Sequence, residues 1–374
     1  MSNNIILPPT ASTADVWSHC PKSLDLSQQI QKQISDKDMG RICHNVCADV
    51  LMAVIHGHCR DPTKMVSALT SDPDIQATTV AYVNYISENY QFIKKTCRDP
   101  YIIVEHSLDY STWIPCGHGI VDCALISDDV VHIVDLKFGL KAVPPAKENA
   151  QLKCYALGVL NIFGCLYQAK NFKLTIFQPR LGKEDTVIIS PEELYSWANE
   201  QKQRLVADER EFNVGTHCLM CEARPTCRAY VSNILQIGKH INTDAHVLTD
   251  DEVVTLFPFV ESLQKWSESF ISYSVQRALN GVDFPNHKLV NGRIKRSYRD
   301  KEEIASMVSE CGFDPYKQEL KNFTEMKAMM GETAFNAVIA PKLEIEKSAP
   351  KLVSVNDRRP KLALQEYKNW RNLE

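Results

Sequence analysis

Residues 132–139 read "HIVDLKFG", and this stretch decides the fold because it is a short apolar strand with charges at its centre. Side chains alternate across a strand, so Asp135 and Lys137 share one face while Val134 and Leu136 turn toward a core on the other. A charged pair on a buried strand is costly unless the charges are paired or used. The pattern is therefore typical of a salt-bridged edge strand or of a functional site.

The segments around this strand predict an α/β protein. Apolar residues at threefold and fourfold spacing predict helices within 22–60 and 76–96, and a further helix starts near residue 147. A serine followed by acidic residues starts another helix at 190. Strands are expected over 101–111, 117–127, 130–139 and 171–180, with "SDD" as a hairpin turn before the third. We expect a mixed central sheet flanked by helices, followed from about residue 245 by a charged helical region.

Composition excludes some classes of protein and leaves others open. The chain has 374 residues, 44% apolar and 24% charged, with a net charge of −4, so nucleic-acid binding would depend on local basic patches. No apolar run is long enough to span a bilayer, and the N-terminus lacks the features of a signal peptide. A cytoplasmic protein without a membrane partner is expected. Thirteen cysteines are many for such a chain, and clustered ones suggest metal binding or catalysis.

The polar residues of neighbouring elements form a possible metal site. Asp122 lies on the strand before Asp135, and the hairpin can bring the two carboxylates together. Paired carboxylates repel unless a divalent cation lies between them. Lys137 could then position or deprotonate a water, which is the chemistry of a metal-assisted phosphodiesterase. Gln151 and Tyr155, four residues apart, share one face of the next helix.

Together, Gly119-x-x-Asp122, Asp135-x-Lys137 and Gln151-x-x-x-Tyr155 resemble the PD-(D/E)XK nuclease superfamily, and most closely its RecB-like branch. In that branch a histidine on an early helix also binds metal, and "GRICH" supplies Gly40 and His44. Val121 replaces the proline of the signature. The resemblance implies the following roles: Mg²⁺ or Mn²⁺ held by His44, Asp122, Asp135 and the Leu136 carbonyl, water orientation by Lys137, and support by Gln151 and Tyr155.

Two further residues near these motifs have two interpretations each. Arg180, after the strand 171–180, is a candidate phosphate contact or an ordinary surface arginine. Glu105, on the first strand, is a candidate to assist the metal site or an exposed strand carboxylate, and the second is the simpler interpretation.

Cysteines near both ends of the first 235 residues form a second pattern. "HCLMCEARPTC" contains Cys218, Cys221 and Cys227, and a fourth thiol is available from Cys20 in "WSHCPKS". A distant N-terminal cysteine with a C-terminal triplet is similar to the iron–sulfur subgroup of RecB-like nucleases. That similarity implies a [4Fe–4S] cluster that joins the two ends of the nuclease domain. Zn²⁺ on the same four thiols is the main alternative.

Over about residues 10–360 the chain resembles a phage and prophage family long catalogued as a domain of unknown function. This implies a DNA exonuclease acting on double-stranded ends, in the cytoplasm of a bacterial host, beside a phage single-strand annealing protein. A structure-specific endonuclease and a non-catalytic DNA-binding module are the alternatives. The expected domains are a nuclease domain at 1–235, a helical domain at 245–345 and a flexible tail at 346–374. Five basic residues of the helical domain form either a patch that contacts DNA phosphate or a charged loop in solvent. They are Lys288, Arg293, Lys295, Arg296 and Arg299.

Overall fold

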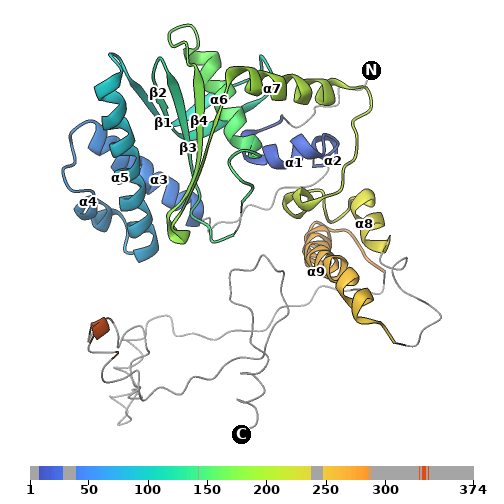
Figure 1. Ribbon diagram of the computed structural model, residues 1–374. Coiled ribbons are helices and arrows are strands. Elements are labelled where there is room, and N and C mark those ends of the chain that lie inside the picture. The colour runs from blue at the N-terminus through green and yellow to red at the C-terminus, as the bar shows by residue number, and fades with distance from the viewer. Residues whose placement is uncertain are drawn as a thin grey trace, which may run out of the picture. The chain divides into compact units, whose positions relative to one another are not determined.

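A five-stranded mixed sheet is the centre of the computed structural model (Figure 1), which describes residues 8–27, 39–141, 143–236, 247–285, 287, 328, 331–333 and 336. The strands follow one another across the sheet in chain order. Their bounds are β1 Tyr101–Asp109, β2 His118–Ile126, β3 Val130–Leu136, β4 Asn171–Gln178 and β5 Lys183–Ile189. Only β3 and β4 are parallel, because α6 connects them, whereas the other pairs are antiparallel. The predicted α/β class is confirmed.

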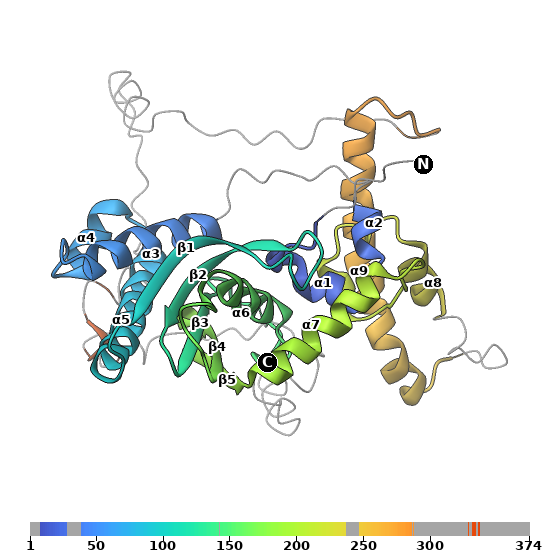
Figure 2. The same cartoon turned by 90° about the horizontal axis from the view of Figure 1, so that it is seen from above.

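Helices cover both faces of this sheet (Figures 1 and 2). On one face lie α3, α4 and α5, and on the other lie α6, α1 and α7. The helix bounds are α1 Ala14–His19, α2 Ser23–Ser27, α3 Met39–Ile55, α4 Pro62–Leu69, α5 Pro73–Thr96, α6 Ala150–Phe163, α7 Pro191–Val206, α8 Arg228–Ile234 and α9 Asp250–Leu279. Short 3-10 turns are η1 Ala11–Thr13, η2 Pro179–Leu181 and η3 Thr216–Met220.

The alternation of β3 divides its side chains between these two layers. Val134 and Leu136 are fully buried in the core beneath α3 and α5, as the opening pattern predicts. Ile133 packs into the second core, beneath α6, and Asp135 has the same parity. The charged face of the strand is therefore the face that α6 covers.

Local chemistry explains where most of these elements begin and end. Ser190 accepts a hydrogen bond from the Glu193 amide at 3.2 Å and caps α7, as its sequence predicts. Thr249 and Glu252 form a capping box at the start of α9. Gly281, with φ of 89°, follows the end of α9 and provides the left-handed conformation that stops it.

Four of the described helices and strands were not predicted from the sequence: β5 and the short helices α1, α4 and α8. β5 is an edge strand with the sequence KEDTVII, four polar residues followed by three apolar ones, so it lacks the polar–apolar alternation that predicts a strand. α4 has only eight residues and begins at Pro62, with Asp61 capping the Thr63 and Lys64 amides. The predicted helical stretch 22–60 contains two helices, α2 and α3, with residues 28–38 outside the described part.

The N-terminal segment packs against the far end of β2. Thr10 forms a parallel bridge with His118, and the Trp17 indole donates to the Thr10 carbonyl at 2.9 Å. Gly119 is needed at this contact because a Cβ there would lie 2.6 Å from the Ala11 side chain. The segment that carries Cys20 is thereby joined to the sheet.

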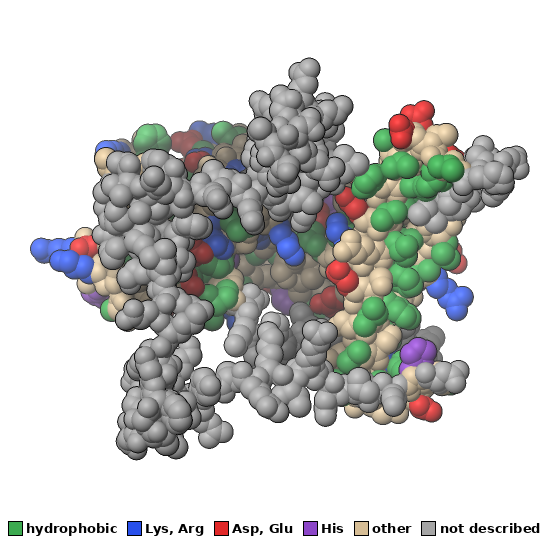
Figure 3. All heavy atoms as spheres, turned by 90° about the horizontal axis from the view of Figure 1, so that it is seen from below, with side chains coloured by type: hydrophobic (Ala, Val, Ile, Leu, Met, Phe, Trp, Pro, Cys, Tyr) green, Lys and Arg blue, Asp and Glu red, His purple; other side chains and the backbone are tan. Residues whose placement is uncertain are grey.

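The last described helices form a smaller cluster. Cys218, Tyr230 and Ile234 are buried together, and Trp266 of α9 packs against them. The opposite side of α9 exposes apolar residues that include Val260, Ile271 and Val275, seen as a line of green side chains in Figure 3. No helix among the described residues is both long enough and apolar enough to cross a membrane.

The chain divides into two compact units, residues 1–289 and 290–374. All strands and the helices α1 to α9 belong to the first unit. The predicted tail 346–374, most of the predicted helical domain after residue 285, and the basic patch lie outside the described residues. The domain boundaries therefore stay predictions.

Candidate metal centre

Two buried carboxylates face each other across the β2–β3 hairpin. Cys123 pairs with Val134 in the antiparallel register, so Asp122 and Asp135 are the next pair along these strands. Their exposed fractions are 8% and 1%. Asp122 Oδ2 accepts a hydrogen bond from the Leu136 amide at 2.7 Å. The structure thus brings together three of the residues for which metal ligation was predicted.

Asp122 also belongs to a group of three residues whose side chains can bind a metal ion. His44, on α3, has its Nδ1 atom 3.1 Å from Asp122 Oδ1 and 3.8 Å from Glu105 Oε1. Ligand atoms of these three residues all lie within 4.8 Å of one another. Glu105 is exposed, as the sequence favoured, and its carboxylate also lies beside this candidate metal site.

The backbone at Glu105 is unusual for the middle of a strand. Its φ is 44°, in the left-handed region, where a residue with a side chain is strained. Val104 and His106 pair with Cys123 and Val121, so the neighbours on both sides keep the regular register. Glu105 is therefore held in this conformation directly opposite Asp122.

Lys137 belongs to a chain of polar contacts that ends on α6. Its ammonium lies 2.8 Å from Asp135 Oδ2 and donates to Gln151 Oε1 at 3.0 Å. The Gln151 amide in turn donates to the Tyr155 hydroxyl at 2.8 Å. Gln151 and Tyr155 are one turn apart, as predicted, and their shared helix face meets the charged face of β3. Asp135 and Tyr155 are buried, whereas the Lys137 side chain is 26% exposed, so solvent reaches these contacts at the lysine.

The electrostatics of the site favour bound positive charge. Burial lowers the pKa of His44, but its contacts with Asp122 and Glu105 outweigh burial and raise that pKa to about 10. Burial raises the pKa of Asp135, with Asp122 adding to the effect and Lys137 opposing it. Burial also disfavours the Lys137 ammonium, but Asp135 more than compensates and raises the pKa. The charged form of Lys137 is therefore favoured beside Asp135.

Arg180 lies next to the site but is already engaged. Its guanidinium pairs with Asp74 at 2.5 Å, stacks 4.6 Å from the Phe138 ring centre and donates to the Phe138 carbonyl. These contacts brace the segment after Lys137. A phosphate would have to compete with Asp74 for this arginine.

The four cysteines of the second pattern line a single small cavity. Burial raises the pKa of Cys221 to about 11, and the sulfurs of Cys218, Cys20 and Cys227 contribute to that shift. Burial raises the pKa of Cys218 as well. The structure thus gathers all four thiols, although Cys20 is far away in sequence. His217 lines the same cavity, but its Nε2 atom is engaged by the Asn213 carbonyl at 2.9 Å.

Comparison with known families gives one match over nearly the whole chain. The model of a family described as "Protein of unknown function (DUF2800)" matches residues 9–360. The chain belongs to the DUF2800 family. The expected membership of a family catalogued as a domain of unknown function is confirmed by this match.

Among solved structures, this DUF2800 protein has a match to the crystal structure of SSO0001. The two are 11% identical, and the match covers 56% of this chain and 94% of that chain with a TM-score of 0.23. So low a score carries no argument about fold or function. The assignment of this DUF2800 chain to the α/β class depends on its own sheet and helices.

Proposed function

We propose that this DUF2800 protein is a metal-dependent DNA exonuclease with a PD-(D/E)XK core, acting at double-stranded ends. One observation carries the proposal: the His44, Glu105 and Asp122 group lies beside the buried Asp135–Lys137 ion pair. A candidate cation site next to an ammonium is an arrangement that suits metal-assisted hydrolysis of a phosphodiester.

The residues present fit a hard divalent cation. Ligands about 2.1 Å from Mg²⁺ lie at most about 4.2 Å apart, and the three ligand atoms lie within 4.8 Å, so a small contraction suffices. Asp122 and Glu105 raise the pKa of His44, so a cation bound by this imidazole would displace the proton that these carboxylates favour. His44, Asp122, Asp135 and the Leu136 carbonyl would hold Mg²⁺ or Mn²⁺, with Glu105 as an additional ligand. The metal would supply Lewis acidity for attack on phosphorus.

The chain's own residues supply orientation and charge. An ammonium has three N–H donors; Gln151 accepts from Lys137 at 3.0 Å, and Asp135 forms an ion pair with the same ammonium at 2.8 Å. A further N–H would be available to a water or to a phosphate oxygen. Because Gln151 accepts from Lys137 and donates to Tyr155, the Tyr155 hydroxyl proton is directed elsewhere, toward a second acceptor. The substrate's phosphate is the acceptor that this proposal assigns to it.

A [4Fe–4S] cluster on Cys20, Cys218, Cys221 and Cys227 is part of the proposal. The four thiols line one cavity, a lining that fits either an iron–sulfur cluster or Zn²⁺. The resemblance to the iron–sulfur subgroup of RecB-like nucleases favours the cluster. The cluster would join the two ends of residues 1–235.

The remaining parts of the proposal concern the cellular setting. Residues 1–235 would form the nuclease domain and 245–345 a helical domain, with a tail from 346. Arg293, Lys295 and Arg296 would contact DNA. The protein would act in the cytoplasm of a bacterial host as a phage gene product, with a single-strand annealing protein as its partner.

Cleavage of end-labelled linear DNA and of closed circular DNA tests the proposal. With Mn²⁺ or Mg²⁺ the wild type should degrade the linear DNA only, and cleavage of the circle would identify an endonuclease instead. Asp135→Asn and Lys137→Met should each lower the rate at least 100-fold, because the cation and the water lose their partners. Lys141→Met, a nearby lysine outside the polar chain, is the control. Binding of DNA without any cleavage would show a non-catalytic module.

A further inference from the structure

Cys20 is held in place by contacts that do not involve the other three cysteines. Arg204, in the last turn of α7, donates to the carbonyls of Ser18 and His19, with an Nη2–O distance of 3.0 Å to His19. Ser18 and His19 are the last residues of α1, where carbonyls lack partners within the helix. Cys20 follows directly as the C-cap residue. The arginine thus satisfies the helix end that presents the thiol.

The guanidinium is itself anchored in the main core. Its Nη1 atom also donates to Gln201 Oε1 at 3.3 Å, and Gln201 is 4% exposed. The same helix buries Ala198 and Leu205 in the core beneath α6. Arg204 therefore connects a rigid layer of the fold to the residue before Cys20.

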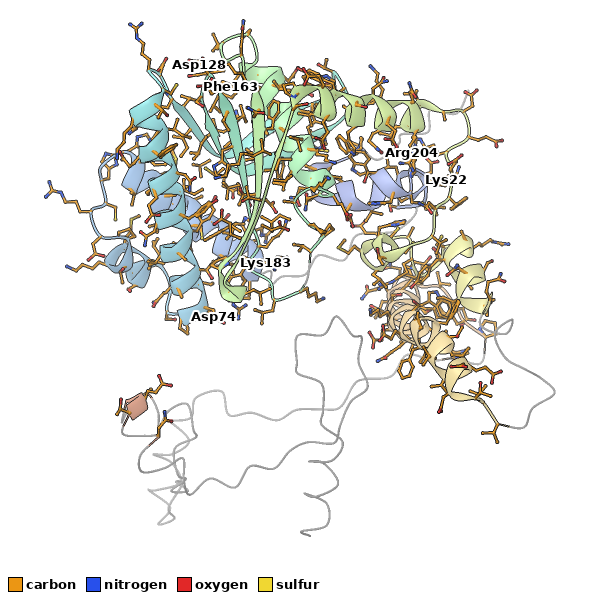
Figure 4. The ribbon with its side chains drawn as sticks, viewed as in Figure 1. Lys22, Asp74, Asp128, Phe163, Lys183 and Arg204 are labelled. Carbon is orange, nitrogen blue, oxygen red and sulfur yellow. The ribbon has the colours of Figure 1, made fainter. Side chains whose placement is uncertain are left out.

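Further contacts fix the residues that follow Cys20. Arg210 pairs with Asp25 of α2 at 2.6 Å and donates to the Leu205 carbonyl at 2.9 Å. The Lys22 amide donates to the Glu211 carbonyl at 3.4 Å. Figure 4 labels Lys22 and Arg204, which lie close together at this junction. Residues 18–25 are thus bound on both sides of the cysteine.

We propose that Arg204 is a positioning residue for the four-cysteine site, which sets the Cys20 sulfur in place before a cluster assembles. The inference rests on the iron–sulfur cluster of the proposed function. Roughly 200 residues separate Cys20 from the other three cysteines, so closing that loop costs conformational entropy. The contacts of Arg204 offset this loss of conformational entropy during folding. The cluster then binds four thiols that are already close together.

The test compares clusters in full-length protein purified without oxygen. Wild-type protein should contain about four irons per chain, the content of a cluster on four thiolates. Arg204→Ala should behave like Cys20→Ala, with about one iron in four lost and, after ferricyanide oxidation, the EPR signal of a three-iron cluster. Arg204→Lys keeps the charge but replaces the two donor nitrogens that reach Ser18 and His19 with one, so an intermediate iron content is expected.

The control is Lys202→Ala, on the same helix, whose ammonium reaches only the Thr112 carbonyl at 3.5 Å. It should keep four irons and give no three-iron signal. A merely structural role for Arg204 would lower the melting temperature without producing that signal. If Arg204→Ala and Arg204→Lys keep four irons while Cys20→Ala loses one, the positioning role is refuted and the cluster stands. A wild type without iron refutes both.

Discussion

At the scale of single residues, Glu105 links backbone strain to the candidate site. A non-glycine residue in the left-handed region costs of order 1–3 kcal/mol, and it persists only where the surroundings impose it. Here the paired residues on both sides, Val104 and His106, impose it. The result is a carboxylate with an oxygen within 4.8 Å of the ligand atoms of His44 and Asp122.

Replacing Glu105 with glycine should distinguish the effect of backbone strain on stability from the effect of the carboxylate on metal binding. Glycine adopts positive φ freely, so Glu105→Gly should leave the metal-free unfolding free energy unchanged or raise it by up to about 1 kcal/mol. Removal of the carboxylate should weaken Mn²⁺ binding at least tenfold. Urea unfolding without metal and calorimetric titration with Mn²⁺ measure the two effects.

Glu105→Gln is the matched variant, because it keeps the strained backbone and removes only the charge. It should weaken Mn²⁺ binding without any gain in stability. Unchanged Mn²⁺ affinity in both variants would exclude Glu105 from the ligand set.

At the scale of elements, close packing sets the position of β2. A Cβ on Gly119 would lie 2.6 Å from the Ala11 side chain and 3.2 Å from Cε1 of Tyr155. Gly119 thus lets the N-terminal segment and α6 approach the same point of the strand. The glycine of the Gly-x-x-Asp motif has a packing role that also brings Tyr155 to the site.

Gly119→Ala should destabilise the protein by about 1–3 kcal/mol, since an extra methyl in a close-packed contact forces its neighbours apart. The displaced Tyr155 should also reduce cleavage. Gly139→Ala is the control, because nothing lies within 4 Å of a Cβ at that position. Equal urea midpoints for the two variants would contradict this account of the contact.

At the scale of the whole molecule, stability depends on a core that contains an uncharged histidine. His132 of β3 is 2% exposed, and its Nε2 atom lies 2.9 Å from the Thr175 hydroxyl. Burial, with a smaller contribution from Lys173, lowers its pKa to about 3. The folded protein therefore keeps this ring neutral where the unfolded chain would protonate it.

This histidine should make the fold sensitive to acid. Its contribution is fully present above pH 6.5, the usual pKa, and is lost as pH falls toward 3, because only the unfolded chain binds the proton. The expected slope is about 1.4 kcal/mol per pH unit. Urea unfolding at pH 7, 6 and 5 measures it.

His132→Gln should reduce the slope of the unfolding free energy against pH by the contribution of about one proton, because an amide does not titrate. His106→Gln, at an exposed position of β1, should retain the wild-type slope. Identical slopes for wild type and His132→Gln would contradict the neutral buried state.

The local patterns of the chain were sufficient for much of this structure. Periodicity and caps predicted α5, α7 and α9, and alternation predicted β1 to β4 with the hairpin between β2 and β3. The same alternation placed Asp135 and Lys137 on one face. Such features depend on neighbours within a few residues, so the sequence alone determines them. β5 was missed because a half-exposed edge strand has too few apolar residues to be distinguished from a loop.

Other features depend on residues that are distant in the chain, and only the tertiary structure decided them. Glu105 joins His44 because a strained strand and a helix meet there, and no local pattern encodes a φ of 44°. Arg180 pairs with Asp74, over 100 residues away. Cys20 reaches the other cysteines through contacts made by Arg204. The sequence specifies the chemistry of each side chain. Packing in the folded chain determines which distant residues become its partners.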